Sequence, residues 1–164
     1  METYIPRNQI LELLKGVCQI FNGNKIVYLV CGSLAYQLIT KEDITIHDID
    51  IIVHEDDFDK LIELLTHSTL DLKPIKTEFS IHVNHKLLNG VDGKSFDISL
   101  DSYEHYYSQS GIDLNSYQGI DINGILVKVA TIKTMIKVYN TALKGCNVEK
   151  FPEYERKIEV LTNI

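Results

Sequence analysis

The chain has 164 residues, 45% of them hydrophobic and 24% charged, and carries a formal net charge of −7. This composition is typical of a soluble globular protein of one domain, and no apolar run approaches the roughly 20 residues of a membrane-spanning helix. The acidic balance disfavours broad binding to nucleic acid or anionic membrane, because such binding sums many Lys and Arg contacts with phosphates. The first residues carry acids instead of a basic and then an apolar stretch, so we expect no signal peptide and a cytoplasmic location.

The first half of the chain predicts helices and strands in alternation. Apolar positions recur at helical spacing after Pro6, whereas the β-branched and aromatic run "KIVYLV" and the run "DIDIIV" suit buried strands. Asp56 or Asp57 is expected to cap the second long helix. The expected elements are a helix over about 6–22, a strand over 25–30, a short helix over 34–39, a strand over 48–53 and a helix over 58–68.

The second half predicts two hairpins followed by helices. Apolar and polar residues alternate in "FSIHVNHKLL" and "SFDISL", which flank the turn-rich "NGVDGK". Asn123 and Gly124 form the strongest short-range hairpin signal that a sequence offers. Thr131 is expected to cap a helix that ends at Gly145, and a last helix is expected after Pro152.

These elements place the chain in the α/β (or α+β) class, as a mixed β-sheet flanked by helices. We expect one domain over residues 1–164. Its core spans about 25–130, with the N-terminal helix before it and the C-terminal helices over about 131–164.

Two acids share one face of the strand "DIDIIV". Alternate side chains of a strand point the same way, so Asp48 and Asp50 form a pair while the isoleucines between and after them point into the core. Two carboxylates held this close repel each other unless a cation neutralises them, and hard oxygen ligands suit Mg²⁺. Asp97, bracketed by Phe96 and Ile98, brings a third carboxylate beside the pair if the two strands are neighbours. Three acids can hold two metal ions.

The turn at Gly32 and Ser33 supplies a second chemical feature. A glycine lets the backbone approach a phosphate closely, and a helix N-terminus offers free N–H groups and a partial positive charge. The Ser33 hydroxyl adds a donor, although it could equally be a helix N-cap. Acids and turn together describe a phosphoryl-transfer site, in which two metal ions clamp the attacking and leaving oxygens.

The segments "CGS", "HDIDIIV" and "SFDISL" resemble, in order and spacing, the signature of the nucleotidyltransferase superfamily related to DNA polymerase β. The resemblance covers roughly Lys25 to Leu100. It implies the nucleotidyltransferase fold, NTP and Mg²⁺ as co-substrate and cofactor, and transfer of a nucleoside monophosphate to an acceptor with release of pyrophosphate.

The resemblance also implies roles for individual residues. Asp48 and Asp50 would hold two Mg²⁺ ions, while Asp97 would share one of them and act as the base toward the acceptor hydroxyl. Gly32 and Ser33 would hold the triphosphate.

Size and layout are similar to those of the small antibiotic nucleotidyltransferases, such as the lincosamide enzymes. This similarity implies a small-molecule acceptor, possibly an antibiotic. The chain departs from their Gly-Gly-Trp turn and from their Arg before the acid pair, because it has "CGS", no tryptophan and His47. The alternatives are a toxin-like enzyme that modifies tRNA or protein, and a catalytically silent module that binds a partner. A homodimer or a helical protein partner is compatible with each.

Four further groups are candidates near the site. Among the lysines of the late helix, Lys137 is the predicted triphosphate-binding residue, and a solvated helix face is the alternative. His47 is either a substrate contact or a structural histidine. Tyr103, Tyr106 and Tyr107 either line the acceptor pocket or form a packed aromatic cluster. Asp101 competes with Asp97 as the third acid, but its place beside Ser102 favours a turn.

Overall fold

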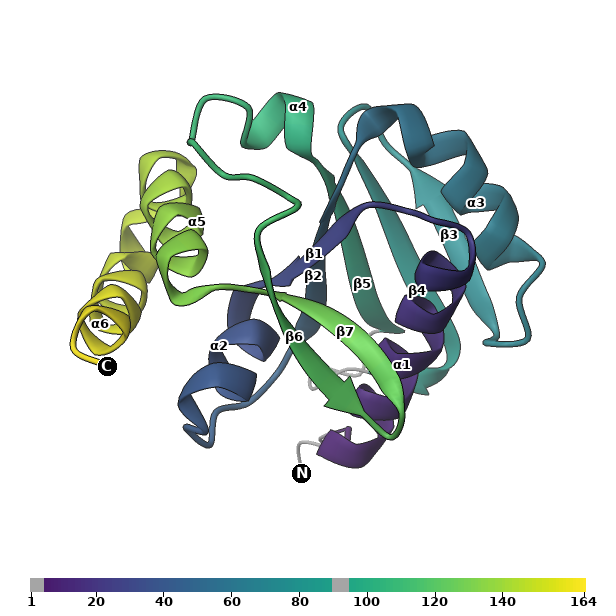
Figure 1. Cartoon of the computed structure of the whole chain (residues 1–164), viewed down its shortest axis with the longest axis horizontal. Coiled ribbons are helices and arrows are strands. Elements are labelled where there is room, and N and C mark those ends of the chain that lie inside the picture. Colours follow the sequence, from purple (N-terminus) through teal and green to yellow (C-terminus); the bar gives the residue numbers. More distant parts are fainter. Residues whose placement is uncertain (1–4, 90–94) are drawn as a thin grey trace.

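A mixed seven-stranded sheet flanked by helices forms the body of the protein (Figure 1). The computed structural model describes residues 5–89 and 95–164. Within these ranges the strands are β1 (Tyr28–Cys31), β2 (Asp48–Val53), β3 (Leu72–Lys76), β4 (Ser80–Asn89), β5 (Ser95–Ser102), β6 (Tyr117–Ile122) and β7 (Ile125–Ala130). The α-helices are α1 (Arg7–Gly23), α2 (Gly32–Thr40), α3 (Phe58–Thr66), α4 (Tyr103–Tyr106), α5 (Ile132–Gly145) and α6 (Phe151–Thr162), and 3-10 turns cover Glu55–Asp57 and Val148–Lys150. The predicted α/β class is confirmed.

The strand order places the two acid-bearing strands side by side. The sheet runs β3-β4-β5-β2-β1-β7-β6. Strand β2 is parallel to β5 and β1 is parallel to β7, while the other neighbours are antiparallel. The condition under which Asp97 joins the acid pair is therefore met, because β2 and β5 are direct neighbours.

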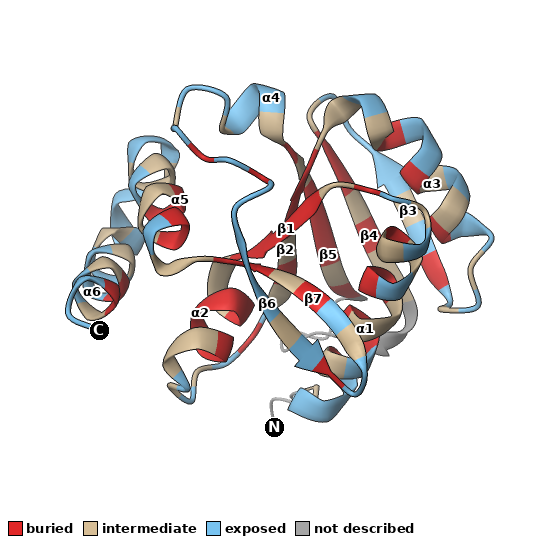
Figure 2. Cartoon of the chain, viewed as in Figure 1, coloured by how far each residue is buried: buried red, intermediate tan, exposed pale blue. Residues whose placement is uncertain are grey.

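The core lies around the central strands. Buried residues concentrate on β1, β2 and β5 (Figure 2), and both Ile49 and Ile51 are fully buried as predicted. Helices α1 and α3 lie on the right in Figure 1, and α2, α5 and α6 gather on the left. The apolar faces of α1 and α3 bury Leu14, Phe21 and Leu61. Burial of each such side chain stabilises the folded state by about 1.5–3 kcal/mol. This stabilisation offsets the cost of holding charged side chains at the edge of the core.

Local signals decide where most elements begin and end. Asn123 and Gly124 both have positive φ, as the predicted two-residue hairpin between β6 and β7 requires. Thr131 caps α5, because its side chain accepts a hydrogen bond from the Thr134 N–H. Asp57 occupies the predicted N-cap position of α3, but its side chain makes no capping hydrogen bond. The turn predicted between β4 and β5 lies outside the described residues, since it covers 90–94.

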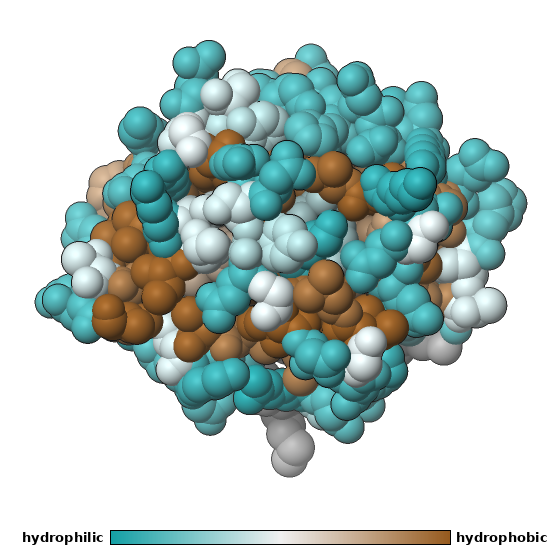
Figure 3. All heavy atoms as spheres, in the orientation of Figure 1, coloured by the Kyte–Doolittle hydropathy of each residue, from teal (hydrophilic) through white to brown (hydrophobic). Residues whose placement is uncertain are grey.

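The surface mixes hydrophilic residues with separate hydrophobic groups (Figure 3). The exposed large hydrophobic residues are scattered over several elements and include Leu126 on β7 and Val148 before α6. In the described part of the chain, none of the helices has both the length and the apolar character needed to cross a membrane.

Candidate active site

Four aspartates stand on one face of the paired strands β2 and β5. The register places Asp48 opposite Asp97, and Ile52 opposite Asp101. Since alternate residues of a strand share a face, Asp48, Asp50, Asp97 and Asp101 all project to the same side of the sheet. The predicted third acid, Asp97, therefore lies beside the pair, and Asp101 is a fourth acid on the same face.

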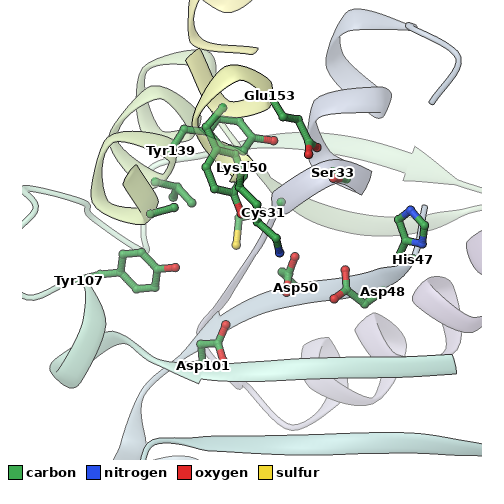
Figure 4. A pocket seen from close by; sticks show the side chains of 14 residues that line it. Cys31, Ser33, His47, Asp48, Asp50, Asp101, Tyr107, Tyr139, Lys150 and Glu153 are labelled. Carbon is green, nitrogen blue, oxygen red and sulfur yellow. The ribbon is translucent and has the colours of Figure 1, made fainter. Parts of the chain in front are cut away.

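Three of the four acids border a cavity of about 560 Å³ between the sheet and the C-terminal helices. Figure 4 shows Asp48, Asp50 and Asp101 pointing into it from β2 and β5, with Tyr107 on one side. The opposite wall comes from the start of α2 and from α5 and α6. The lining residues from these walls include Cys31, Gly32, Ser33, Tyr139, Lys150, Glu153 and Tyr154. Asp97 is not among the lining residues; it lies opposite Asp48 on the neighbouring strand, with its side chain 32% exposed.

Burial and mutual repulsion raise the pKa values of the two carboxyls of β2. Burial, followed by the charges of Asp48, Asp101 and Asp97 in that order of effect, raises the pKa of Asp50 to about 8. Burial and the neighbouring Asp97 also raise the pKa of Asp48. The Lys150 side chain reaches toward Asp50 (Figure 4), and its charge lowers the pKa of both strand β2 acids in part. The cluster therefore carries more negative charge than its protein neighbours neutralise.

Asp97 and Asp101 are held by different partners. Burial raises the pKa of Asp97, and the hydrogen bond from His82 opposes this effect; the Asp97 Oδ2 lies 3.2 Å from the His82 Nδ1. The other oxygen of Asp97, Oδ1, is buried without a hydrogen-bond partner. Asp101 was expected in a turn, but it lies within β5, and the hydroxyls of Ser80 and Ser99 both donate to its Oδ1 over 2.8 Å.

Gly32 is required by the approach of Asp50. Cys31 pairs with Asp50 across the antiparallel strands β1 and β2, so the next residue of the chain lies directly beside the Asp50 carboxylate. Gly32 has a φ of +70°, and a Cβ atom placed there would overlap the Asp50 Oδ2. Only glycine meets both conditions without strain. The "CGS" turn and the "DID" strand are thus two halves of one site.

Helix α2 starts at this turn and directs its N-terminus at the cavity. Cys31 occupies the N-cap position without a side-chain capping bond, and Gly32 is the first helical residue. Ser33 therefore lies in the first turn of α2. The alternative role predicted for it, that of helix N-cap, belongs to Cys31 instead. Its Oγ accepts a hydrogen bond from the Lys157 Nζ of α6, over 3.0 Å. The first N–H groups of a helix lack partners within it, so this end is suited to an anion.

The donor set of the site fits Mg²⁺. Within residues 5–89 and 95–164, no three His, Cys, Asp or Glu side chains are arranged to hold a metal ion by themselves. Mg²⁺ sites in nucleotide enzymes commonly take one or two protein carboxylates and complete their coordination with substrate phosphates and water. Asp48 and Asp50 provide such carboxylates, and the unpartnered Oδ1 of Asp97 leaves an acceptor beside them. A divalent cation would also relieve the repulsion that raises the Asp50 pKa.

The structure places the predicted lysine elsewhere. The Lys137 Nζ donates to the carbonyl of Gly111 over 2.8 Å, and Lys137 is not among the residues that line the cavity. Lys150, in a 3-10 turn before α6, lines the cavity instead. No motif marks Lys150 in the sequence, because its position depends on how the C-terminal helices pack.

The predicted aromatic cluster is divided between the cavity and the packed surface. Tyr107 lines the cavity. Tyr103 donates to the carbonyl of Ile112, and Tyr106 meets the Phe79 ring edge-on. His47 also lines the cavity, next to Asp48. Sequence reasoning missed Tyr139, whose buried hydroxyl has no hydrogen-bond partner.

No protein-family model matches the chain, and no curated protein matches it. Among solved structures it is similar to an antigenic nucleotidyltransferase-like protein from Paracoccidioides brasiliensis, with a TM-score of 0.71 and 17% identity, covering 97% of this chain and 78% of that one. The antibiotic-resistance factor ANT(2'')-Ia has a TM-score of 0.60 and 12% identity, with 95% and 90% covered. Lincomycin-bound LnuA, a lincosamide antibiotic adenylyltransferase, has a TM-score of 0.58 and 12% identity, with 98% of each chain covered. These likenesses confirm the fold implied by the sequence motifs.

Proposed function

Because the chain has the nucleotidyltransferase fold, we propose that it is a metal-dependent nucleotidyltransferase that transfers an NMP from an NTP to a hydroxyl of a small-molecule acceptor. One observation carries the proposal. Three carboxylates on β2 and β5, with Asp97 beside them on the same face of the sheet, border one side of a cavity whose other side holds the N-terminus of α2 and Lys150. The first group of residues suits cations and the second suits phosphates, as transfer from a metal-bound triphosphate requires.

The triphosphate belongs at the start of α2. The free N–H groups of its first turn and the Ser33 hydroxyl donate to phosphate oxygens, and Gly32 lets the backbone approach them. Lys150 contributes positive charge from the other wall. Asp48 and Asp50 would hold Mg²⁺, which when bound neutralises charge on the phosphates and on the departing pyrophosphate.

Asp97 accepts the proton of the acceptor hydroxyl in this proposal. The acceptor oxygen forms a bond to the α-phosphorus, the bond from that phosphorus to pyrophosphate breaks, and the hydroxyl proton moves to the Asp97 carboxylate. Burial raises the pKa of Asp97, which makes it a stronger base than an exposed aspartate. Asp101 is held rigidly by two serines and faces the cavity beside Tyr107, so it contacts the acceptor.

Several features support a small-molecule acceptor. The cavity volume of about 560 Å³ lies within the range of small-molecule sites, which is roughly 300–1,000 Å³. Tyrosines and carboxylates line it, so it offers stacking surfaces and hydrogen-bond acceptors to a polar organic molecule. A net charge of −7 works against RNA. Two similar structures, ANT(2'')-Ia and LnuA, are described as an antibiotic-resistance factor and an antibiotic adenylyltransferase, which makes hydroxylated antibiotics the first acceptors to test.

A thermal-shift experiment tests the nucleotide site without knowledge of the acceptor. The melting temperature is measured with each of the four NTPs, with and without Mg²⁺, for the wild type and the Asp48→Asn/Asp50→Asn variant. At a ligand concentration of about 100 times Kd, binding stabilises the folded state by about 2.7 kcal/mol, or roughly 5–10 °C for a chain of this length. We expect a Mg²⁺-dependent rise that the variant loses.

Transfer itself is tested with NTP labelled at the α-phosphorus. Candidate acceptors are hydroxylated antibiotics, bulk tRNA and the protein itself, and the label is followed into each. Label on a small molecule supports the proposal, and label on tRNA or protein moves the assignment to a toxin-like enzyme. An unchanged melting temperature with every MgNTP would contradict the nucleotide site altogether.

A further inference from the structure

We propose that Lys157 is a positioning residue that fixes the Ser33 hydroxyl as a hydrogen-bond donor to phosphate. The inference rests on the proposed function, because it concerns the same phosphate site. It assigns a role to α6, which carries none of the residues predicted from the sequence motifs.

Lys157 is a buried cation at the junction of three helices. Only 2% of the residue is exposed, although lysine is almost never fully buried unless it is paired. Its Nζ donates to the Ser33 Oγ over 3.0 Å and to the Glu153 Oε1 over 2.9 Å. The rings of Tyr36 in α2 and Tyr139 in α5 flank the ammonium group, with centroids 5.4 and 5.5 Å away. The amine is therefore held in one place by aromatic surfaces and two oxygen partners.

The chemistry of the two partners sets the direction of the hydrogen bond. An ammonium group carries three N–H donors and no acceptor, so the Ser33 oxygen must be the acceptor of this contact. The Ser33 hydroxyl proton cannot point at Lys157 and remains available for another acceptor. Ser33 lines the cavity, whereas Lys157 is not among the lining residues. Lys157 therefore acts on a ligand through Ser33 and not by direct contact.

The charge of Lys157 lies where an isolated helix would not favour it. The N-terminus of a helix carries partial positive charge, so a cation beside the first turn of α2 is unfavourable unless an anion accompanies it. Glu153 supplies one anion, but its side chain is 55% exposed and its charge is screened by solvent. A phosphate at the start of α2 would supply a second anion and would accept the proton that Ser33 presents. The positive charge at the start of α2 is therefore fully balanced only when an anionic ligand binds there.

A double-mutant cycle tests the inference, with inorganic tripolyphosphate in the presence of Mg²⁺ as the probe. Calorimetry measures its Kd for the wild type, Lys157→Met, Ser33→Ala and the double variant. Loss of one charge-assisted hydrogen bond weakens binding by about tenfold or more, so we expect each single variant to show such a loss. The double variant should bind no more weakly than the weaker single variant, because both changes remove the same interaction. Lys144→Met, at an exposed position of α5, is the matched control and should leave Kd unchanged.

Two outcomes would overturn the inference while the proposed function stands. Losses that multiply in the double variant would show that Lys157 contacts the phosphate itself. An unchanged Kd in Lys157→Met, with a lower melting temperature, would show a purely structural role. If Lys157→Met does not fold, Lys157→Gln enters the same cycle, because its side chain keeps N–H donors; we expect it to lose less affinity than Ser33→Ala. Wild-type protein that binds neither tripolyphosphate nor any NTP would instead refute the proposed function, and this inference with it.

Discussion

Replacing Asp50 by Asn should make the metal-free protein more stable while removing its activity. Asp50 is held among three other carboxylates, and burial with their repulsion raises its pKa to about 8 from an ordinary value of 3.8. The folded state therefore binds a proton that the unfolded chain has already released between these two values. Stability falls as pH rises through this window, because the unfolded state binds fewer protons there. Asn has nearly the same shape as protonated Asp but does not ionise.

The size of the effect follows from the two pKa values. Each pH unit between them costs about 1.4 kcal/mol, so the cost of keeping Asp50 in the fold is about 4 kcal/mol at pH 7. Asp48, Asp97 and Asp101 still repel one another in the variant. We therefore expect Asp50→Asn to gain about 2–4 kcal/mol at pH 7 and little near pH 4, because the unfolded carboxyl is only partly ionised at that pH.

Urea denaturation in the presence of EDTA, at pH values from 4 to 8, measures this difference. The control is Asp59→Asn, because the Asp59 side chain is 91% exposed and pairs with Lys76 at the surface. Exposed pairs of this kind contribute about 0–1 kcal/mol, so the control should follow the wild type. An Asp50→Asn variant that is less stable than the wild type at pH 8 would refute the reasoning, since it would show that the Asp50 charge is already neutralised within the protein.

Four further variants separate the parts of the site. Gly32→Ala should lose NTP binding and about 1–2 kcal/mol of stability or more, because it forces a side chain into the left-handed region and against the Asp50 carboxylate; denaturation and a thermal shift with MgNTP measure both. Asp97→Asn should abolish label transfer with MgNTP binding retained, whereas Asp101→Asn should mainly raise the KM for the acceptor; the opposite pattern would exchange their roles. Tyr139→Phe should leave metal-free stability within about 0.5 kcal/mol, since its hydroxyl has no partner to lose, and any weakening of NTP binding would identify that hydroxyl as a ligand contact.

The sequence predicts the elements of this fold better than their relations. Periodic runs and the Asn123-Gly124 turn identify one hairpin and every helix except the short α4, since these signals are local. Strand β3 is harder to predict from the sequence, because Pro74 weakens the strand pattern. This proline is tolerated because β3 lies at the edge of the sheet. The position of Asp101 within β5, facing the cavity, also escapes the local pattern, since it depends on the register against β2.

The acids and the turn are visible in the sequence, but the lysines are not. Asp48 and Asp50 are paired by strand geometry alone. Since side chains alternate along a strand, two acids separated by one residue must lie on the same face. Lys150 and Lys157 reach the site only because α5 and α6 fold back beside α2, and nothing in their own segments distinguishes them from solvated lysines. Cations brought by tertiary packing are therefore the part of a phosphate site that sequence reasoning is least able to predict.

One geometric relation connects the two motifs that carried the resemblance. Strands β1 and β2 are antiparallel neighbours with Cys31 opposite Asp50, so Gly32, the residue after β1, lies against the Asp50 carboxylate. Helix α2 and the segment after it bring the chain back, so that β2 begins beside the end of β1. A change of register by one residue would turn both acids of β2 into the core and move the isoleucines into the cavity. The glycine of the turn, the spacing of the acids and the length of the intervening helix are thus constrained together, which explains why order and spacing identify this fold more strongly than any of the three motifs alone.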